Sequence, residues 1–252
     1  MDIKINDKII KDIKLIIFDK DGTIIDLHKY WSFVISKRAF YFSQLFKNNQ
    51  DKIYNDVKLS MGLVNDSKIS NNGPVGLKSR KYIIEIVLNI LITFDKNITI
   101  EIIESGFNEV DKDIDLHFKD ILQKLNGVDD LLKTLEKTEC KLAIATTDVS
   151  RRVVSSFQFL NIEEYFDFIV GSDMVTNSKP SPDMIEKILN QYTDIKKDEI
   201  ILIGDSMADL NMAENAKIKF IGVNTGLYSK EFMQKSEYFI EDLTRIQVIS
   251  NV

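Results

Sequence analysis

The chain has 252 residues, a formal net charge of −6, and 44% apolar and 29% charged residues, which excludes a disordered or fibrous protein. This acidic balance, with no long basic cluster, disfavours nucleic acid as the main partner. A single cysteine, Cys140, excludes an intrachain disulfide and fits a reducing cytoplasm. Residues 1–14 lack the apolar run of a secretory signal, and the most apolar stretch, 83–94, is shorter than the roughly 20 residues that span a bilayer. We therefore expect a cytoplasmic protein that has no membrane partner.

Five short apolar runs are typical of strands that are buried on both faces of a parallel sheet. They cover residues 13–18, 141–145, 166–170, 200–203 and 219–223. Between them, apolar residues recur at helical spacing, as at Leu131, Leu132 and Leu135. Another helix is expected to have Ser181 as its cap and Pro182 as its first residue. Strands that alternate with helices predict an α/β fold with a doubly wound parallel sheet.

The segment after the first apolar run interrupts this alternation. Aromatic residues at helical spacing come first, then a polar stretch at 65–76, and then an apolar helix near 82–94. No strand signal recurs before Cys140. The pattern predicts a helical domain inserted into a core domain, the insertion covering 27–118 and the core covering 1–26 and 119–252.

Polar and charged residues that follow four of the apolar runs are candidates for a functional site. In a parallel sheet the carboxyl ends of the strands share one edge, and functional sites form just beyond it. The residues that we therefore expect to meet at this edge are Asp19, Asp21, Gly22, Thr146, Thr147, Lys179, Asp205 and Asp209.

Two carboxylates that lie two residues apart suit phosphoryl chemistry. Asp19 can attack phosphorus and form an acyl phosphate, and Asp21 can give a proton to the leaving alcohol and later take one from water. Asp205 adds a third carboxylate, and such a cluster of hard oxygen ligands suits Mg²⁺. Thr146 offers a hydroxyl to phosphate oxygens, while Lys179 offsets the negative charge of the transferring group.

Three neighbouring residues have more local roles. Thr147 is expected to offer a backbone contact to phosphate, and Gly22 to lie at the same phosphate site. Asp148 follows directly and is expected to cap the next helix.

The cysteine and several glycines are interpreted from their positions relative to the predicted strands and site. Cys140 begins a predicted strand and is expected to be a small buried core residue. Because Gly22 and Gly204 lie inside the proposed site, they should resist replacement more than Gly106 or Gly226.

Four motifs of the chain resemble, in their usual order, those of the haloacid-dehalogenase-like superfamily: Asp19 to Thr23, Thr146, Lys179-Pro180 and Gly204 to Asp209. The resemblance implies a Rossmann-like core with a helical cap, the cap being the insertion after the first motif. It also implies aspartyl-phosphate chemistry, with Mg²⁺ held by the carboxylates of Asp19 and Asp205 and the backbone carbonyl of Asp21. Asp209 would then serve the outer shell of the metal, and Thr146 and Lys179 would contact phosphate.

The acid at Asp21 discriminates among members of this family. Its dehalogenases lack an acid there, and its ion-pumping ATPases carry Thr and need membrane spans. The nearest subgroup is similar to phosphoglycolate phosphatase, so we expect a Mg²⁺-dependent phosphatase that acts on a small phosphorylated metabolite. One alternative is a phosphomutase, which uses the same core residues but excludes water. A second is a non-enzymatic signalling module, which also combines an acceptor Asp with a Thr and a Lys at strand ends.

The predicted helical domain offers four candidates for substrate contact. His28 lies near an expected hinge, and Lys78 and Arg80 can clamp a carboxylate or a second phosphate. Trp31 lies among aromatic residues at helical spacing. Each also has a structural interpretation: hinge packing for His28, helical core for Trp31, and a solvated basic face for Lys78 and Arg80.

Overall fold

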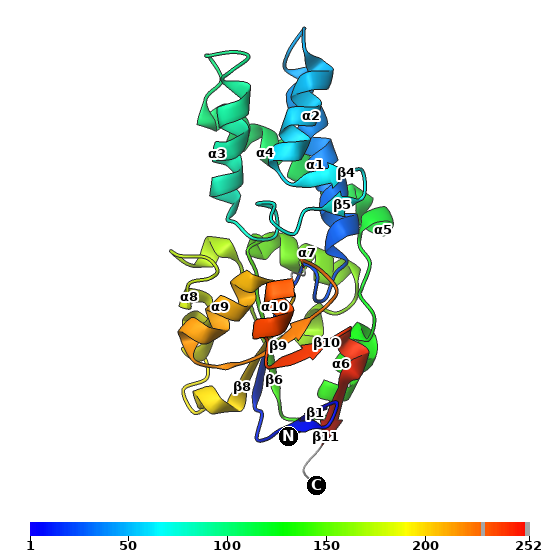
Figure 1. The fold of residues 1–252 in the computed structure, drawn as a ribbon, viewed down its shortest axis with the longest axis vertical. Helices are drawn as coiled ribbons and strands as arrows, with labels where there is room; N and C mark the ends of the chain where they lie inside the picture. The colour runs from blue at the N-terminus through cyan, green and yellow to red at the C-terminus, as the bar shows by residue number, and fades with distance from the viewer. Residues whose placement is uncertain (228–229, 250–252) are drawn as a thin grey trace. The chain divides into compact units, whose positions relative to one another are not determined.

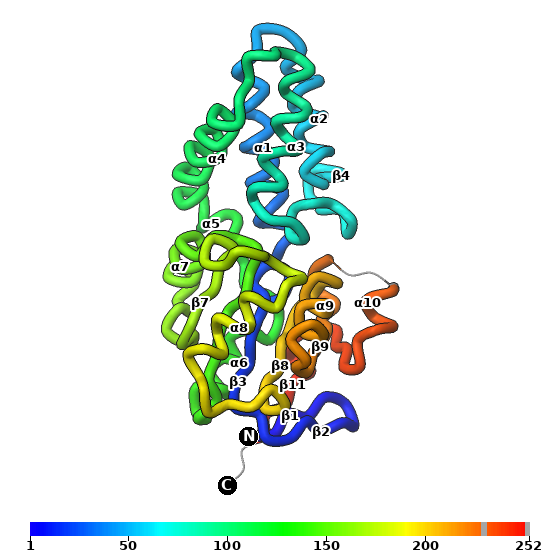
Figure 2. Tube along the Cα trace, turned by 90° about the vertical axis from the view of Figure 1, so that its left-hand side faces the viewer, coloured from blue at the N-terminus to red at the C-terminus, as the bar shows by residue number. Residues whose placement is uncertain are grey.

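The computed structural model describes residues 1–227 and 230–249 (Figures 1 and 2). It divides into two compact units, which we call the core unit, Met1–Asp26 with Lys124–Val252, and the helical unit, Leu27–Gln123. The first boundary coincides with the expected one. The second lies five residues later than residue 118, because the short helix α5 (Phe118–Ile121) contacts α1 (Leu27–Gln44) and belongs with the helical unit.

The core unit is built on a six-stranded parallel sheet in the order β10-β9-β8-β3-β6-β7. The central strand β3 pairs with β6 on one side and β8 on the other, so Phe18 lies opposite both Ile144 and Ile203. The carboxyl ends of these three strands therefore share one edge. The strands are β3 (Leu15–Phe18), β6 (Lys141–Ala145), β7 (Phe168–Val170), β8 (Ile200–Gly204), β9 (Lys219–Val223) and β10 (Tyr238–Ile240).

Helices cover both faces of this sheet, as a doubly wound α/β fold requires. Leu15 and Ile17 of β3 share an apolar cluster with residues of α8 and α9, whereas Phe18 contacts Phe166, which stacks on Phe157 of α7. The fold class expected from the sequence is therefore confirmed. The helices of the core unit are α6 (Val128–Leu135), α7 (Ser150–Phe159), α8 (Asp183–Leu189), α9 (Met207–Ala216) and α10 (Lys230–Lys235).

Several boundaries in the core unit differ from the expected ones. The strands expected from residues 13 and 166 begin at Leu15 and Phe168, because Phe166 still follows the 3₁₀ turn η2 (Glu163–Tyr165). Helix α8 begins one residue late, so that Pro182 is its cap rather than its first residue. Cys140 precedes β6 and is half-buried, so the expectation of a fully buried core residue is wrong. Burial nevertheless raises the pKa of its thiol to about 12.

Three further strands form a small antiparallel sheet that the sequence pattern did not reveal. The order is β11-β1-β2, with β1 (Asp2–Ile5), β2 (Lys8–Ile10) and β11 (Ile246–Ile249). Asn6 takes a left-handed conformation between β1 and β2, which a short Asn side chain tolerates at a tight turn. The sheet joins the first described strand to the last, and the sixth parallel strand β10 was likewise not expected.

The helical unit packs its long helices around aromatic and aliphatic side chains. Helix α1 contacts both α2 and α4, and α3 contacts the same two helices (Figure 1). Tyr30, Val34, Phe42 and Phe107 are fully buried in this unit. Its other helices are α2 (Gln50–Ser60), α3 (Arg80–Leu91) and α4 (Ile100–Ile114).

A hairpin contradicts the expectation that no strand lies between the first apolar run and Cys140. It consists of β4 (Leu63–Asn65) and β5 (Lys68–Ile69). The Asn65 side chain accepts a hydrogen bond from the Ser67 backbone N–H (3.1 Å), which closes the turn locally. Two strands this short leave too few apolar residues for a period-two pattern to be recognised.

Gly106 is also not the tolerant position that the sequence suggested. A methyl group on its Cα would lie 2.6 Å from Tyr41 Cε1 and 2.7 Å from Phe42 Cε1. Both aromatic residues belong to α1, so Gly106 allows α4 and α1 to approach closely. Helices α1 and α4 thus meet at a small residue that pattern reading assigned no role.

No helix in the described part of the chain is long and apolar enough to cross a membrane.

Candidate active site

The site lies at the carboxyl edge of the parallel sheet, where Asp19 follows the last residue of β3. Its backbone N–H donates to the carbonyl of Ile203 (2.8 Å), which extends the β3–β8 ladder by one residue and fixes the Asp19 backbone. The Asp19 side chain is buried and accepts a hydrogen bond from Lys179 Nζ at 2.5 Å. Lys179 comes from the loop before α8, 160 residues along the chain.

Asp209 is the second carboxylate that holds Lys179. Its Oδ1 accepts from Lys179 Nζ (2.6 Å), and its Oδ2 accepts from the hydroxyl of Ser206 (2.5 Å). Ser206 in turn caps α9, and Asp209 completes a capping box by reaching back to the Ser206 backbone N–H (3.2 Å). A local helix cap therefore aims Asp209 at Lys179. Gly204 makes room for it, since an added methyl group would lie 2.6 Å from Asp209 Cβ.

Asp205 is enclosed by two loops. Its Oδ2 accepts from the backbone N–H of Leu227 at 2.5 Å, and a methyl group on either Gly22 or Gly226 would collide with its carboxylate. Gly22 also has a positive φ of 92°, which favours glycine. The expectation that Gly226 tolerates replacement is therefore wrong, because its close approach to Asp205 depends on tertiary structure.

Sequence reasoning missed this loop after β9. Thr225 donates its hydroxyl proton to the carbonyl of Gly22 (2.5 Å), so the loop braces the first motif. The polar residues that follow the fifth apolar run were the signal that could have revealed this loop, because polar residues after the other four runs already marked the site.

Three carboxylates form a compact cluster of potential metal ligands. One oxygen each of Asp19, Asp205 and Asp209 lies within 4.8 Å of the others, and all three residues are buried. Burial and then neighbouring charge, chiefly from Asp209 and Asp21, raise the pKa of Asp19 to about 7 although Lys179 opposes the shift. Burial and the charges of Asp19 and Asp209 raise the pKa of Asp205 well above its usual range. Such a cluster of oxygen donors holds more negative charge than one lysine balances, which suits a hard cation.

Lys179 remains charged in this environment. Burial alone lowers the pKa of a lysine, but the carboxylates of Asp19 and Asp209 outweigh it and raise the pKa above the ordinary value. The ammonium group is thus a fixed positive charge at the end of β3, where it can oppose the charge of a bound anion.

A second buried ion network adjoins the site and was not expected. The Lys20 ammonium lies 2.7 Å from Asp148 Oδ2 and 3.1 Å from Asp21 Oδ1, and Arg152 Nη1 lies 3.1 Å from Asp148 Oδ1. The role of helix cap expected for Asp148 is wrong, because α7 begins after Val149 and Asp173 accepts from the first helical N–H, that of Ser150 (2.7 Å).

The two threonines follow β6 as expected. Thr146 is buried, and its hydroxyl accepts from the backbone N–H of Asp148 at 3.1 Å. Its own N–H donates to the carbonyl of Val170 (3.0 Å), which continues the β6–β7 ladder. Thr147 is half-buried and comes directly after it. Their contacts with phosphate stay predictions.

All four candidates in the helical unit contact other residues of that unit. His28 Nδ1 accepts from the Ile69 backbone N–H (3.2 Å), Trp31 is buried beside Tyr30, and Arg80 forms an ion pair with Asp111 (2.8 Å). Lys78 is exposed and lies over the Tyr82 ring (5.9 Å to its centroid). The contacts of His28, Trp31 and Lys78 match the structural interpretations, whereas Arg80 is paired with a buried aspartate rather than solvated. Contact of the four residues with substrate stays a prediction.

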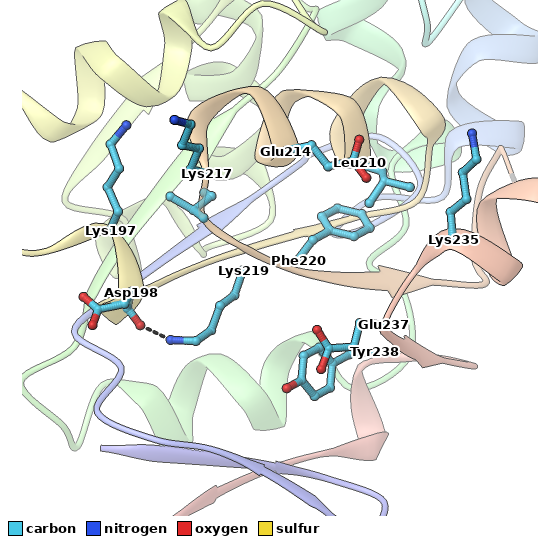
Figure 3. Close-up of a pocket in the computed structure, with 11 residues that line it drawn as sticks. Lys197, Asp198, Leu210, Glu214, Lys217, Lys219, Phe220, Lys235, Glu237 and Tyr238 are labelled. Atoms are coloured by element: carbon cyan, nitrogen blue, oxygen red, sulfur yellow. Dashed lines mark hydrogen bonds between the residues drawn. The ribbon is translucent and has the colours of Figure 1, made fainter.

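A hollow of about 710 Å³ elsewhere in the core unit is lined mainly by charged residues (Figure 3). It adjoins Lys219, the first residue of β9, and Tyr238, the first of β10. It therefore lies at the amino end of these strands, opposite the edge that carries Asp19 and Asp205. Lysines and acids are mixed in its lining: Lys197, Lys217, Lys219, Lys235, Glu214 and Glu237.

Comparison with known proteins now identifies relatives. A family model described as haloacid dehalogenase-like hydrolase matches residues 16–223. The pyrophosphatase PpaX of Halalkalibacterium halodurans is 31% identical over 119 residues, which cover 47% of this chain and 55% of that protein. The chain thus matches a little over half the length of this curated relative, and 62% of a second pyrophosphatase PpaX, from Listeria monocytogenes.

Solved structures share the fold at low identity. A predicted phosphoglycolate phosphatase from Haemophilus somnus has a TM-score of 0.70 at 17% identity, covering 92% of this chain and 96% of that one. CbbY from Rhodobacter sphaeroides, solved in complex with phosphate, has a TM-score of 0.62 at 19% identity, covering 92% and 95%. At these identities the likeness concerns the fold alone.

Proposed function

The chain belongs to the haloacid dehalogenase-like hydrolase family, and from this premise we propose that it hydrolyses a phosphate monoester of a small metabolite with Mg²⁺ as cofactor. The observation that carries the proposal is the position of Asp19, whose carboxylate lies at the end of the central strand against Lys179. A nucleophilic carboxylate beside a fixed positive charge is what the transfer of a phosphoryl group to protein requires.

In the first step Asp19 attacks phosphorus. A bond forms between its carboxylate oxygen and phosphorus while the bond from phosphorus to the ester oxygen breaks. Asp21 gives its proton to that leaving oxygen, so the alcohol departs neutral. Lys179 and the hydroxyl of Thr146 hold the phosphoryl oxygens, and the backbone around Thr147 and Gly22 adds further contacts.

In the second step water attacks the phosphorus of the aspartyl phosphate. Asp21, now a carboxylate, takes a proton from the water. The bond between phosphorus and the Asp19 oxygen breaks, which releases inorganic phosphate and restores the Asp19 carboxylate. Atoms and charges balance over the two steps, and the protein returns to its starting state.

The donor set around Asp19 fits Mg²⁺. Asp19 and Asp205 would hold it through carboxylate oxygens and Asp21 through its backbone carbonyl, with Asp209 supporting from the outer shell. The observation that supports this fit is the cluster of three buried carboxylates, whose oxygens lie within 4.8 Å of one another. Lys179 pairs with two of them, Asp19 and Asp209. When bound, the cation supplies positive charge to the carboxylates and to the phosphoryl oxygens.

We propose that the helical unit is the substrate-selecting cap of this enzyme. Its candidates for substrate contact are His28, Trp31, Lys78 and Arg80. The curated relatives named pyrophosphatase and the similar fold named phosphoglycolate phosphatase support a small phosphorylated substrate. Inorganic pyrophosphate and phosphoglycolate therefore belong in the first panel of substrates. Stimulation of turnover by an added sugar bisphosphate would favour the phosphomutase alternative instead.

The experiment compares phosphate release from p-nitrophenyl phosphate by the parent protein and by Asp19→Asn. The parent should be active with Mg²⁺ and inactive with a chelator, and the variant should be inactive in both. Asp130→Asn, an exposed residue of α6, is the matched control and should retain the parent rate. Parent-like activity in a folded Asp19→Asn protein would show the mechanism to be wrong.

A further inference from the structure

A lysine buried between two carboxylates of the first motif has no part in the chemistry above. Lys20 lies between Asp19 and Asp21 in the chain, and its side chain is wholly inaccessible to solvent. Its ammonium group lies 3.1 Å from Asp21 Oδ1 and 2.7 Å from Asp148 Oδ2. Burying an ammonium group is costly unless it is paired and hydrogen-bonded. An aliphatic residue would fill the same space without that cost.

Asp148 is itself held from three sides. Its Oδ1 accepts from the Val149 backbone N–H (2.8 Å) and pairs with Arg152 (3.1 Å), while its own N–H donates to Thr146 Oγ1 (3.1 Å). Burial alone raises the pKa of Asp148, but Arg152 and Lys20 outweigh it and lower the pKa to about 2. The carboxylate is therefore a permanent anchor for the Lys20 ammonium group.

The contacts form one chain from helix α7 to the first motif: Arg152 to Asp148, Asp148 to Lys20, and Lys20 to Asp21. All four residues are buried, at 5% exposure or less. A buried chain of ion pairs restricts each member to one geometry.

We propose that Lys20, anchored by Asp148 and Arg152, is a positioning residue that holds the Asp21 carboxyl group where it can protonate the leaving oxygen. This inference rests on the proposed function, in which Asp21 is the acid. Asp21 needs a fixed orientation because proton transfer demands hydrogen-bond distance to one particular atom of the substrate. Lys20 supplies this orientation through its anchor, Asp148, in the loop that follows the neighbouring strand β6.

The test exploits the leaving group. Nitrophenolate departs without a proton, whereas an alkoxide needs one, so a misplaced acid costs more on alkyl esters. We expect Lys20→Met to lower kcat/KM on glycerol phosphate by about 10- to 100-fold more than on p-nitrophenyl phosphate, within the range that acid catalysis contributes. This constant reports the first step alone, so the second step, which both esters share and in which Asp21 is the base, does not mask the difference. Asp148→Asn should shift the ratio of the two rates in the same direction.

Lys141→Met is the matched control, since it breaks another lysine–aspartate pair, the one between Lys141, the first residue of β6, and Asp167 (2.8 Å). It should leave the ratio of the two rates unchanged. An equal loss on both esters in Lys20→Met would reduce Lys20 to a structural ion pair and overturn the proposal.

A crystal structure of Lys20→Met provides a readout besides activity. We expect the Asp21 carboxyl group to turn away while Asp19 and Asp205 keep their places; an unmoved Asp21 would overturn the proposal. If Lys20→Met does not fold, Arg152→Met tests the outer end of the same network by the same ratio and the same structure. Failure of the proposed function would look different, because the parent protein would then release phosphate from neither ester.

Discussion

A buried cluster in each unit places a charged side chain between two of opposite sign, but the excess charge of the two clusters differs. In the core unit Lys179 lies between Asp19 and Asp209, so acids predominate. In the helical unit Asp111 lies between Arg38 (2.9 Å) and Arg80 (2.8 Å), so cations predominate. The same physical rule applies to both clusters. Buried charges must be paired, and removing one partner leaves the others buried without a compensating charge.

Position decides what each cluster can do. Asp19 and its neighbours lie at the carboxyl edge of a parallel sheet, where strand ends from distant parts of the chain deliver polar groups to one place. Asp111 lies on α4, and Arg38, on α1, stacks over the Phe107 ring at 4.2 Å. The first cluster can receive a cation and a phosphate, whereas the second joins helices.

The largest expected effect comes from Lys179→Met. Without the lysine the phosphoryl group loses its fixed positive partner, and kcat on p-nitrophenyl phosphate should fall by about 10²- to 10³-fold. The stranded carboxylates should also lower the free energy of unfolding by about 3–5 kcal/mol in chelator. Steady-state kinetics and urea denaturation measure the two effects. Lys187→Met on α8 is the control, and parent-like kcat in Lys179→Met would remove the lysine from the mechanism.

Arg38→Met should show that the charged cluster of the helical unit serves stability and not catalysis. It removes one of the two arginines that pair with Asp111, so the free energy of unfolding should fall by about 3 kcal/mol, while kcat on p-nitrophenyl phosphate stays within a few-fold. Lys37→Met is the control and breaks the partly exposed pair with Asp113 (3.0 Å). It should lower the free energy of unfolding by less than about 1 kcal/mol. Loss of kcat in Arg38→Met without loss of stability would mean that the helical cluster serves the chemistry directly.

Gly106→Ala tests the contact between helices of the helical unit. The added methyl group meets the rings of Tyr41 and Phe42, so overpacking should lower the free energy of unfolding by about 1–3 kcal/mol. Ser105→Ala, on the exposed face of the same helix, should change it by less than about 0.5 kcal/mol. Equal melting temperatures for the two variants would show that α1 and α4 are not held this closely.

The free energy of unfolding should depend on pH because the carboxylates of the core cluster have raised pKa values. Asp19 has a folded pKa of about 7 against an ordinary 3.8, so in chelator the folded state holds the extra proton and stability falls as pH rises from about 4 to 7. Asp205 acts in the same direction. Asp19→Asn should flatten the slope by about 1.4 kcal/mol per pH unit. Urea denaturation of the parent protein and of Asp19→Asn at pH 5, 6 and 7 measures this slope. Identical slopes for the two proteins would contradict the raised pKa of Asp19.

Much of the core unit followed from the sequence because its signals are local and ordered. Apolar runs predicted the five strands, and the shared carboxyl edge of a parallel sheet predicted that Asp19, Lys179 and Asp209 meet. The sixth strand β10 and the small antiparallel sheet were missed, since three or four residues give too short a pattern to distinguish from a loop.

What escaped prediction depends on tertiary contact. Gly226 is constrained only because Asp205 lies against it, and Gly106 only because α1 packs on α4. Lys20 in a motif of acids looks like a surface residue until Asp148 is found beside it. In the helical unit no topological rule gathers polar residues at one edge, so candidates such as His28 and Arg80 could be named but not placed.

The central claim is that Asp19 carries the phosphoryl group. Asp21→Asn with p-nitrophenyl phosphate provides the most direct measurement, because that leaving group needs no acid while the second step still lacks its base. After acid quenching, mass mapping should find one phosphate on the peptide that contains Asp19, removable by hydroxylamine. Phosphate found on another residue, or on none while nitrophenol is still released in a burst, would contradict the account.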